Sequence, residues 1–334
     1  MKKSIRNGLI VGAGLAAGAV VFSREITRYM VKLALDREEP GKGLKMARRI
    51  EKEADRDPLY RQALEDGQAL AALPHEEVEI VANDGEVLIG HWFPVEHPKR
   101  IILAMHGWRS AWYRDFGGIA PFFVEQDCSV LYAEQRGQNA SSGNYMGFGM
   151  LERYDCLDWL KWLEETQGCT LPVYLAGVSM GATTVLMTTG FDLPPQVKGV
   201  IADCGFTSAH AIWDHVCKEG LHLPYKLHQY EAERLCKQKI RVGTKDYSTV
   251  EALRRCKVPV LFIHGLEDDF VPPAMTYENF GACAAPRRLF TVANAGHGMS
   301  FYVDNEGYRR EVLDLWNSCE QGDCGTCFSS QTVL

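Results

Sequence analysis

One stretch of the chain decides the predicted fold, and it reads Leu171-Pro172-Val173-Tyr174-Leu175-Ala176-Gly177-Val178-Ser179-Met180-Gly181-Ala182-Thr183-Thr184. A short apolar run with strand character leads into Gly-x-Ser-x-Gly, and a run compatible with a helix follows. This order is what a nucleophile elbow needs, namely a serine on a tight turn between a strand and a helix. The flanking glycines remove side chains that would clash in such a turn. The motif also arises by chance in glycine-rich turns, so a catalytic interpretation depends on the residues that follow.

Length and composition indicate a globular chain with one large core. At 334 residues, one α/β domain with a short extension is the natural division. The formal charge of -7 gives no reason to expect a nucleic-acid partner. The 11 cysteines have no regular spacing, which favours free, mostly buried thiols in a reducing compartment over a disulfide framework.

The N-terminus differs from the rest of the chain. Lys2, Lys3 and Arg6 precede an uncharged, largely apolar run at residues 7–23. We favour an uncleaved membrane anchor, although the run is short against the ~20 residues of a spanning helix. A signal peptide and a buried helix rich in glycine and alanine are the alternatives. Cationic residues also follow the run, so the side of the membrane is not determined, and a secreted or cytoplasmic location stays open.

Beyond the segment 1–23, the pattern divides the chain into a connector and a domain. Residues 24–75 are charged and helical in character, with two amphipathic helices predicted at 43–55 and 58–73, and the domain covers 76–318. Alternating runs on both sides of Asn83-Asp84-Gly85 predict an antiparallel hairpin. Apolar runs then alternate with helical stretches, which predicts a mostly parallel sheet with helices on both faces. The later predicted strands are 100–105, 129–133, the run before Ser179, 197–202, 258–263 and 288–292, before a last helix at 305–319.

Two candidate partners of Ser179 follow in the chain, each just after a predicted strand. Glu267-Asp268-Asp269 offers a carboxylate that is placed to orient a histidine ring. His297 lies between two glycines, in a loop from which its ring can reach the serine hydroxyl as a general base. Because the chemistry of such sheets sits at the carboxyl ends of the strands, we expect the three groups to meet there.

These motifs together carry a resemblance to a known family. The matching pieces are His106-Gly107, Arg136-Gly137, Gly177-Val178-Ser179-Met180-Gly181, His264-Gly-x-x-Asp268-x-x-Val271-Pro272 and Gly296-His297. From about residue 76 to 317 the chain resembles the α/β-hydrolases, with serine, acid and histidine in their order. Within them it is similar to the branch of serine aminopeptidases and monoacylglycerol lipases, in particular small bacterial members with an N-terminal anchor and no assigned substrate.

The resemblance assigns roles that the residues alone leave open. It implies that Asp268, rather than its two acidic neighbours, is the triad acid. It also implies an oxyanion hole built from the backbone N–H groups of Met180 and Trp108. One loop departs from the family pattern Asp-x-Arg-Gly-x-Gly-x-Ser, because Asn139 stands where the family has its second glycine. Asparagine tolerates the left-handed conformation, so we expect this loop to keep its shape.

Other candidates receive structural interpretations. We expect His106 and His264 to be structural and Cys204 to be a buried neutral thiol. The tail at 319–334 carries cysteines in a Cys-x4-Cys-x2-Cys pattern, namely Cys319, Cys324 and Cys327. A closed zinc site needs four ligands, and no histidine lies nearby to supply one. We therefore predict no metal and no cofactor.

A lid and an apolar pocket complete the prediction. Residues 207–250 lie where this fold inserts a helical lid, with ordinary connecting helices as the alternative. The aromatic candidates for the substrate pocket are Trp112, Tyr113, Phe206 and Phe270, beside Trp108 and Met180 of the oxyanion hole.

The sequence thus predicts a serine hydrolase that cleaves a carboxylester through an acyl-enzyme, without a nucleic-acid partner. Two alternatives remain: a peptidase of the serine aminopeptidase type, acting on a short peptide, and a non-catalytic binding protein tethered to the membrane. Membrane association is expected through the N-terminus, and the sequence does not indicate an oligomeric state.

Overall fold

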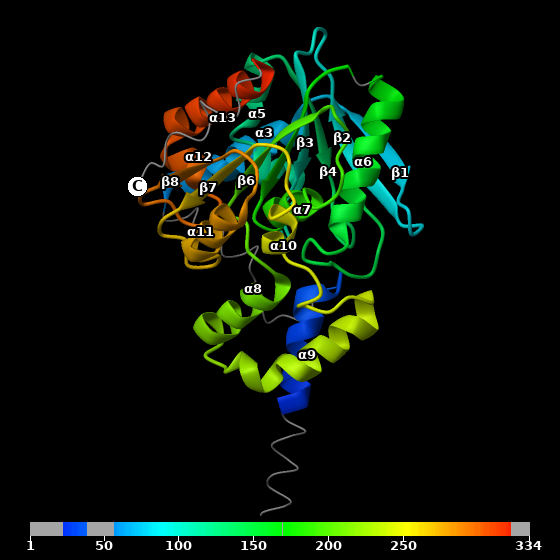
Figure 1. Ribbon diagram of the computed structural model, residues 1–334, viewed down its shortest axis with the longest axis vertical. Coiled ribbons are helices and arrows are strands. Elements are labelled where there is room, and N and C mark those ends of the chain that lie inside the picture. Colours follow the sequence, from blue (N-terminus) through cyan, green and yellow to red (C-terminus); the bar gives the residue numbers. More distant parts are fainter. Residues whose placement is uncertain (1–22, 39–56, 169, 322–334) are drawn as a thin grey trace, which may run out of the picture.

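The computed structural model describes residues 23–38, 57–168 and 170–321 (Figure 1). The predicted anchor segment 1–23 except its last residue, the predicted helix at 43–55 and two of the tail cysteines lie outside these residues. Within the described ranges, no helix is both long and apolar enough to cross a bilayer. The described cysteines are free thiols, and all but Cys319 are buried.

A single eight-stranded sheet forms the centre of the molecule, with the order β1-β2-β4-β3-β5-β6-β7-β8. β2 pairs antiparallel with β1 and with β4, and every later pairing is parallel. The strands are β1 (Glu76–Val81), β2 (Val87–Phe93), β3 (Arg100–Met105), β4 (Cys128–Ala133), β5 (Val173–Val178), β6 (Val197–Asp203), β7 (Val260–Gly265) and β8 (Arg287–Val292). The predicted antiparallel hairpin and parallel sheet are therefore confirmed.

Helices cover both faces of the sheet, because its central strands are apolar on both sides. β3 and β4 are buried along their whole length. One face packs against α6 (Glu152–Gln167), α7 (Met180–Thr188), α10 (Thr249–Leu253) and α11 (Pro273–Ala282). The other packs against α3 (Pro58–Ala72), α4 (Trp112–Phe116), α5 (Ala120–Glu125), α12 (Ser300–Val303) and α13 (Asn305–Glu320).

The predicted lid region forms a separate helical layer beyond the strand ends (Figure 1). It contains α8 (Ala209–His215), the π-helical turn η2 (Val216–Gly220) and α9 (Tyr225–Ile240). The helical residues 23–35, drawn in blue, lie beside α9 in this layer. Val31 and Leu35 of that helix are buried in the same apolar cluster as Trp213 and Tyr225 of the lid. The first part of the predicted connector is thus built into the lid.

Candidate active site

Ser179 occupies a strained turn between β5 and α7. Its backbone has φ 56° and ψ -116°, which non-glycine residues rarely adopt. The motif glycines are required by packing: a Cβ on Gly177 would lie 2.3 Å from the carbonyl carbon of Gly181. A Cβ on Gly181 would lie 1.8 Å from the backbone oxygen of Met105 in β3. The turn therefore has the tight geometry of a nucleophile elbow.

Three side chains meet at this turn in one hydrogen-bonded chain. The Ser179 hydroxyl lies 2.9 Å from Nε2 of His297, and Nδ1 of His297 lies 2.7 Å from Oδ2 of Asp268. Ser179 is only 6% exposed and the Asp268 side chain is 0% exposed. With Nδ1–H donating to the carboxylate, Nε2 is free of its proton and accepts from the serine. The structure thus brings the predicted triad residues together in bonding order.

The acid is held ionised by its neighbours. Burial alone would raise the pKa of Asp268, but the charge of His297 and hydrogen bonds from His264 and His297 hold it well below its usual range. The backbone N–H groups of Phe270 and Val271 also donate to Oδ1, each at 2.9 Å. Conversely, burial would lower the pKa of His297, but the Asp268 carboxylate raises it overall.

A second buried carboxylate, which the sequence reasoning missed, lies beside the triad. Asp203 ends β6, is 3% exposed, and its carbonyl accepts the Ser179 N–H at 2.8 Å. Burial raises the pKa of its carboxyl to about 6, and its charge acts on His297. The sequence did offer a signal for this residue, because Asp203 is an aspartate at the end of an apolar run, directly before Cys204.

The loop after β3 offers one backbone donor to the site. The Gly107 N–H is bound to Oδ2 of Asp115 at 2.6 Å, and the Arg109 N–H to Oε1 of Gln138 at 2.5 Å. Between them, the Trp108 N–H has no hydrogen-bond acceptor among the described residues. A Cβ on Gly107 would lie 3.4 Å from the Ser179 Cβ, so this loop runs directly past the serine.

The second predicted donor is at the start of α7. Met180 is the first residue of that helix, so its N–H has no acceptor within the helix. The arrangement fits the predicted oxyanion donors, Trp108 and Met180, whose role stays a prediction.

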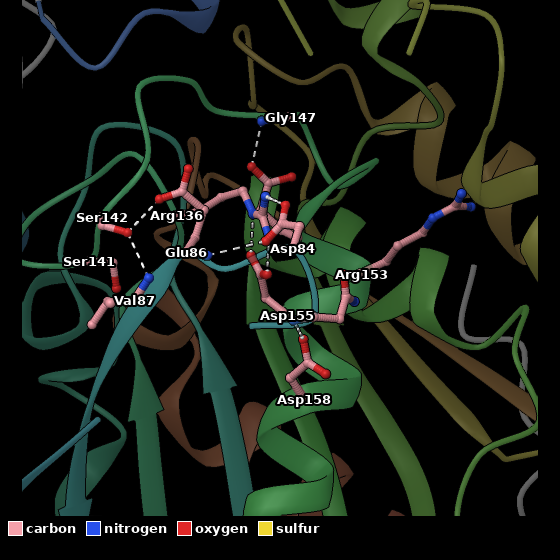
Figure 2. Close-up of polar contacts among 12 residues, drawn as sticks. Asp84, Glu86, Val87, Arg136, Ser141, Ser142, Gly147, Arg153, Asp155 and Asp158 are labelled. Carbon is pink, nitrogen blue, oxygen red and sulfur yellow. Dashed lines mark hydrogen bonds and ion pairs between the residues drawn. The ribbon is translucent and has the colours of Figure 1, made fainter. Parts of the chain in front are cut away.

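The loop after β4 is fixed by a buried ion pair (Figure 2). It supports in turn the loop 106–110 after β3, called the donor loop from here on. The Arg136 guanidinium binds both Asp155, on α6, and Asp84, in the β1–β2 turn. Burial alone would lower the pKa of Arg136, but these carboxylates raise it above its ordinary value. Further along the loop, Asn139 has φ 48° and donates to the Ser110 carbonyl at 3.0 Å. Asn139 thus adopts the left-handed conformation expected in place of glycine.

A cavity of about 280 Å³ opens onto Ser179 and His297. One wall comes from Tyr60, Ala63 and Leu64 of α3, a helix that the sequence placed in the connector. α3 reaches this position through a backbone contact, because a Cβ on Gly117 would lie 2.5 Å from the Gly67 nitrogen. The other lining residues include Trp108, Arg109, Arg114, Asp115, Glu267, Asp269, Phe270, Met299 and Tyr302.

Three of the four aromatic pocket candidates do not line this cavity. Trp112 is 4% exposed and stacks on His91 with ring centroids 4.4 Å apart. Tyr113 packs against the apolar cluster that contains Trp112. Phe206 is 2% exposed and belongs to the apolar cluster beneath the helices α8 and α9. Their apolar character serves the core, which is the commoner place for aromatic residues. Phe270 does line the cavity, and its ring contacts that of His297 at 5.0 Å.

The other candidates occupy buried, bonded positions. His106 donates to the Gly107 carbonyl at 2.8 Å and accepts from the Gln135 N–H at 3.1 Å. His264 lies between Thr276 and the Val271 carbonyl and also contacts Asp268 at 3.2 Å, so it supports the acid. Burial raises the pKa of the Cys204 thiol well above its ordinary value, which keeps it protonated and a poor nucleophile.

Sequence comparison gives a family and one curated relative. The profile of the prolyl oligopeptidase family matches residues 115–318. The uncharacterized protein YqkD of Bacillus subtilis (strain 168) is 26% identical over 197 residues, or 58% of this chain. The match spans 63% of the length of that relative.

Comparison with solved structures gives the fold. The esterase Pf2001 of Pyrococcus furiosus has a TM-score of 0.60 and 20% identity, covering 74% of this chain and 94% of its own. The α/β hydrolase GrgF from Penicillium sp. sh18 has a TM-score of 0.57 and 17% identity, covering 74% and 99%. A bromoperoxidase from Bacillus anthracis has a TM-score of 0.53 and 15% identity, covering 72% and 100%. The predicted α/β-hydrolase fold is confirmed.

Proposed function

Because the chain belongs to the prolyl oligopeptidase family and has the α/β-hydrolase fold, we propose that it is a serine hydrolase that cleaves small carboxylic esters through an acyl-enzyme. One observation carries the reaction type. A continuous hydrogen-bonded chain runs from the Ser179 hydroxyl through His297 to the ionised Asp268. That chain supplies a nucleophile, a base and a group that stabilises the protonated base.

In the first half of the reaction, the Ser179 oxygen attacks the ester carbonyl carbon while its proton passes to Nε2 of His297. Asp268 stabilises the imidazolium, and the Met180 and Trp108 N–H groups donate to the oxyanion. When the carbon–oxygen bond to the alcohol breaks, that alcohol takes the proton from His297. In the second half, a water molecule attacks the acyl-enzyme, gives its proton to His297, and releases the acid with Ser179 protonated again.

The cavity supports a small substrate. Its volume of about 280 Å³ is just below the range of about 300–1,000 Å³ typical of drug-sized ligand pockets. Apolar side chains from α3 and Phe270 line it beside the serine, which suits an acyl or alcohol group with a short hydrocarbon chain. The ester is preferred to an amide because the alcohol leaves more readily than an amine.

Hydrolysis and covalent labelling test this proposal together. The wild type is expected to hydrolyse p-nitrophenyl acetate and to react with a fluorophosphonate probe. Ser179→Ala is expected to lose both, because no other described side chain forms the same bonded chain with His297. Undiminished labelling of folded Ser179→Ala protein would refute the assignment.

A peptidase is the second candidate, and the family match favours it, since that family is named for oligopeptidases. Acidic side chains that would attract an α-amino group, Glu267 and Asp269, stand at the cavity. Arg109 and Arg114 line the same cavity together with a third acidic residue, Asp115, so the lining has mixed charge and does not by itself select an amine. Parallel assays with p-nitrophenyl esters and with aminoacyl p-nitroanilides, including the prolyl one, separate the two activities.

We also propose attachment to a membrane through the N-terminus. Lys2, Lys3 and Arg6 followed by the uncharged run at 7–23 support it. The test is whether full-length protein sediments with membranes and resists extraction by alkaline carbonate. Recovery of full-length protein in the supernatant would contradict attachment.

A further inference from the structure

The helical residues 23–35 end against the loop that passes the nucleophile. The indole Nε1–H of Trp108 donates to the Ala34 carbonyl at 2.9 Å. The Arg109 guanidinium donates to the carbonyls of Leu33 at 3.0 Å and Asp36 at 2.6 Å. Two adjacent side chains of the donor loop therefore cap the C-terminus of this helix.

Capping of this kind is physically favourable. The last carbonyls of a helix have no partner within it, and the C-terminal end carries partial negative charge. An arginine there satisfies several carbonyls at once and compensates the dipole. Arg109 itself has φ 51°, a strained value for a residue with a side chain. Such a conformation persists where surrounding contacts determine it, and the bonds to the helix are such contacts.

The helix is also fixed from its other sides, so it can serve as a support. Thr27 bonds Nδ1 of His228 on α9 at 2.8 Å, and Asp36 pairs with Lys239 of α9 at 2.8 Å. The Arg37 guanidinium donates to the carbonyl of Asn139 at 2.6 Å and to that of Ser141. The segment 23–38 thus joins the lid, the loop after β4 and the donor loop.

We propose that Arg109 is a positioning residue, which uses the C-terminus of the helix 23–35 to aim the Trp108 N–H at the oxyanion. The segment 23–38 is then a structural part of the catalytic centre rather than a linker. This inference rests on the proposed serine hydrolase function. Its consequence is that loosening the contact harms the transition state and leaves substrate binding nearly unchanged, since the oxyanion forms only during reaction.

Steady-state kinetics on full-length protein test the proposal. For Arg109→Gln we expect kcat for p-nitrophenyl acetate to fall about 10- to 100-fold, with KM changed less than about threefold. The affinity for butylboronic acid, which forms a tetrahedral adduct with the serine, should fall by a similar factor. Arg109→Lys should recover part of kcat, because an ammonium also donates to carbonyls.

A helix-side variant and a matched control sharpen the test. Arg37 does not line the cavity, so a lowered kcat in Arg37→Gln does not come from a lost substrate contact. Arg287 donates to the carbonyl of Cys283 at the end of α11, so Arg287→Gln removes a helix-capping arginine elsewhere and should keep wild-type kcat. If Arg109→Gln does not fold, Arg37→Gln and Trp108→Phe decide the question in its place.

The outcomes separate this inference from the proposed function. A wild type that neither hydrolyses esters nor labels with a fluorophosphonate contradicts the function itself. An active wild type whose folded Arg109→Gln and Arg37→Gln variants keep wild-type kcat contradicts the positioning role. A rise in KM alone for Arg109→Gln also contradicts it, because that pattern indicates direct contact with substrate.

Discussion

At the scale of single residues, the protonation state of His297 controls the proposed chemistry. The ring must be neutral to accept the serine proton, and the Asp268 carboxylate stabilises its protonated form. The pKa of His297 is therefore raised above the ordinary value of about 6.5. The nearby Asp203 carboxyl, with a pKa of about 6, adds negative charge as it ionises.

The pH profile of kcat/KM follows from this protonation state. Activity should be lost as pH falls through the pKa of His297, with a midpoint above about 6.5. In Asp268→Asn the charge is gone, so the midpoint should move to lower pH while kcat drops by about 10⁴. Stopped assays with p-nitrophenyl acetate between pH 5 and pH 9 measure both effects. An acid midpoint that Asp268→Asn leaves unmoved would show that the carboxylate does not act on His297.

Single residues were also where sequence reasoning worked best and worst. Ser179, Asp268 and His297 were predicted because each lies in a short local motif at the end of a strand, and parallel strands bring those ends together. The assignment of Trp112 and Phe206 to the pocket failed because an aromatic side chain that follows a strand end can equally well point into the core. Whether a side chain points into the pocket or into the core depends on packing with distant segments, which a local motif does not encode.

At the scale of elements, α3 is the helix whose role the structure changes most. Asp57 caps its N-terminus by accepting the Leu59 N–H at 2.9 Å, and Pro58 stands at its first position. The amphipathic pattern at 58–73 predicted the helix itself, and this cap accounts for where it begins. Its contact with α4 through Gly67 and Gly117 joins segments far apart in sequence, so the wall that α3 provides to the cavity was not predictable.

This wall should set the size of substrate. Leu64→Trp fills part of the cavity and is expected to lower kcat/KM for p-nitrophenyl hexanoate at least about tenfold more than for the acetate. Gln62→Trp is the control, because Gln62 is exposed on the same helix and does not line the cavity. A chain-length series of p-nitrophenyl esters measures the change. Equal losses for short and long esters in Leu64→Trp would argue that α3 does not bound the substrate.

At the scale of the whole molecule, one buried ion pair joins the hairpin, the loop after β4 and α6. The Arg136 and Asp155 side chains are 5% and 1% exposed. The sequence marked Arg136 only through a family motif, whereas the structure shows what it holds: the loop whose Gln138 and Asn139 fix the donor loop. Contacts between three distant segments explain why this role could not be read from the sequence.

Removing one partner should destabilise the whole fold. Arg136→Met leaves Asp155 buried without its counter-charge, and we expect the free energy of unfolding to fall by about 3–5 kcal/mol. Lys257→Met is the control, because the Lys257–Asp192 pair is exposed and should contribute nothing measurable. Denaturation by urea, followed by circular dichroism, compares the two variants. Equal midpoints for Arg136→Met and wild type would contradict the structural role.

Ser179 is the proposed nucleophile of an acyl-transfer enzyme. The most direct test of this assignment is to treat the wild type with diethyl p-nitrophenyl phosphate, digest it, and locate the covalent adduct by peptide mass spectrometry. We expect one diethylphosphoryl group on Ser179, loss of ester hydrolysis in proportion to labelling, and no adduct in Ser179→Ala. An adduct on a different residue that accompanies loss of activity, or full activity with Ser179 replaced, would contradict the assignment.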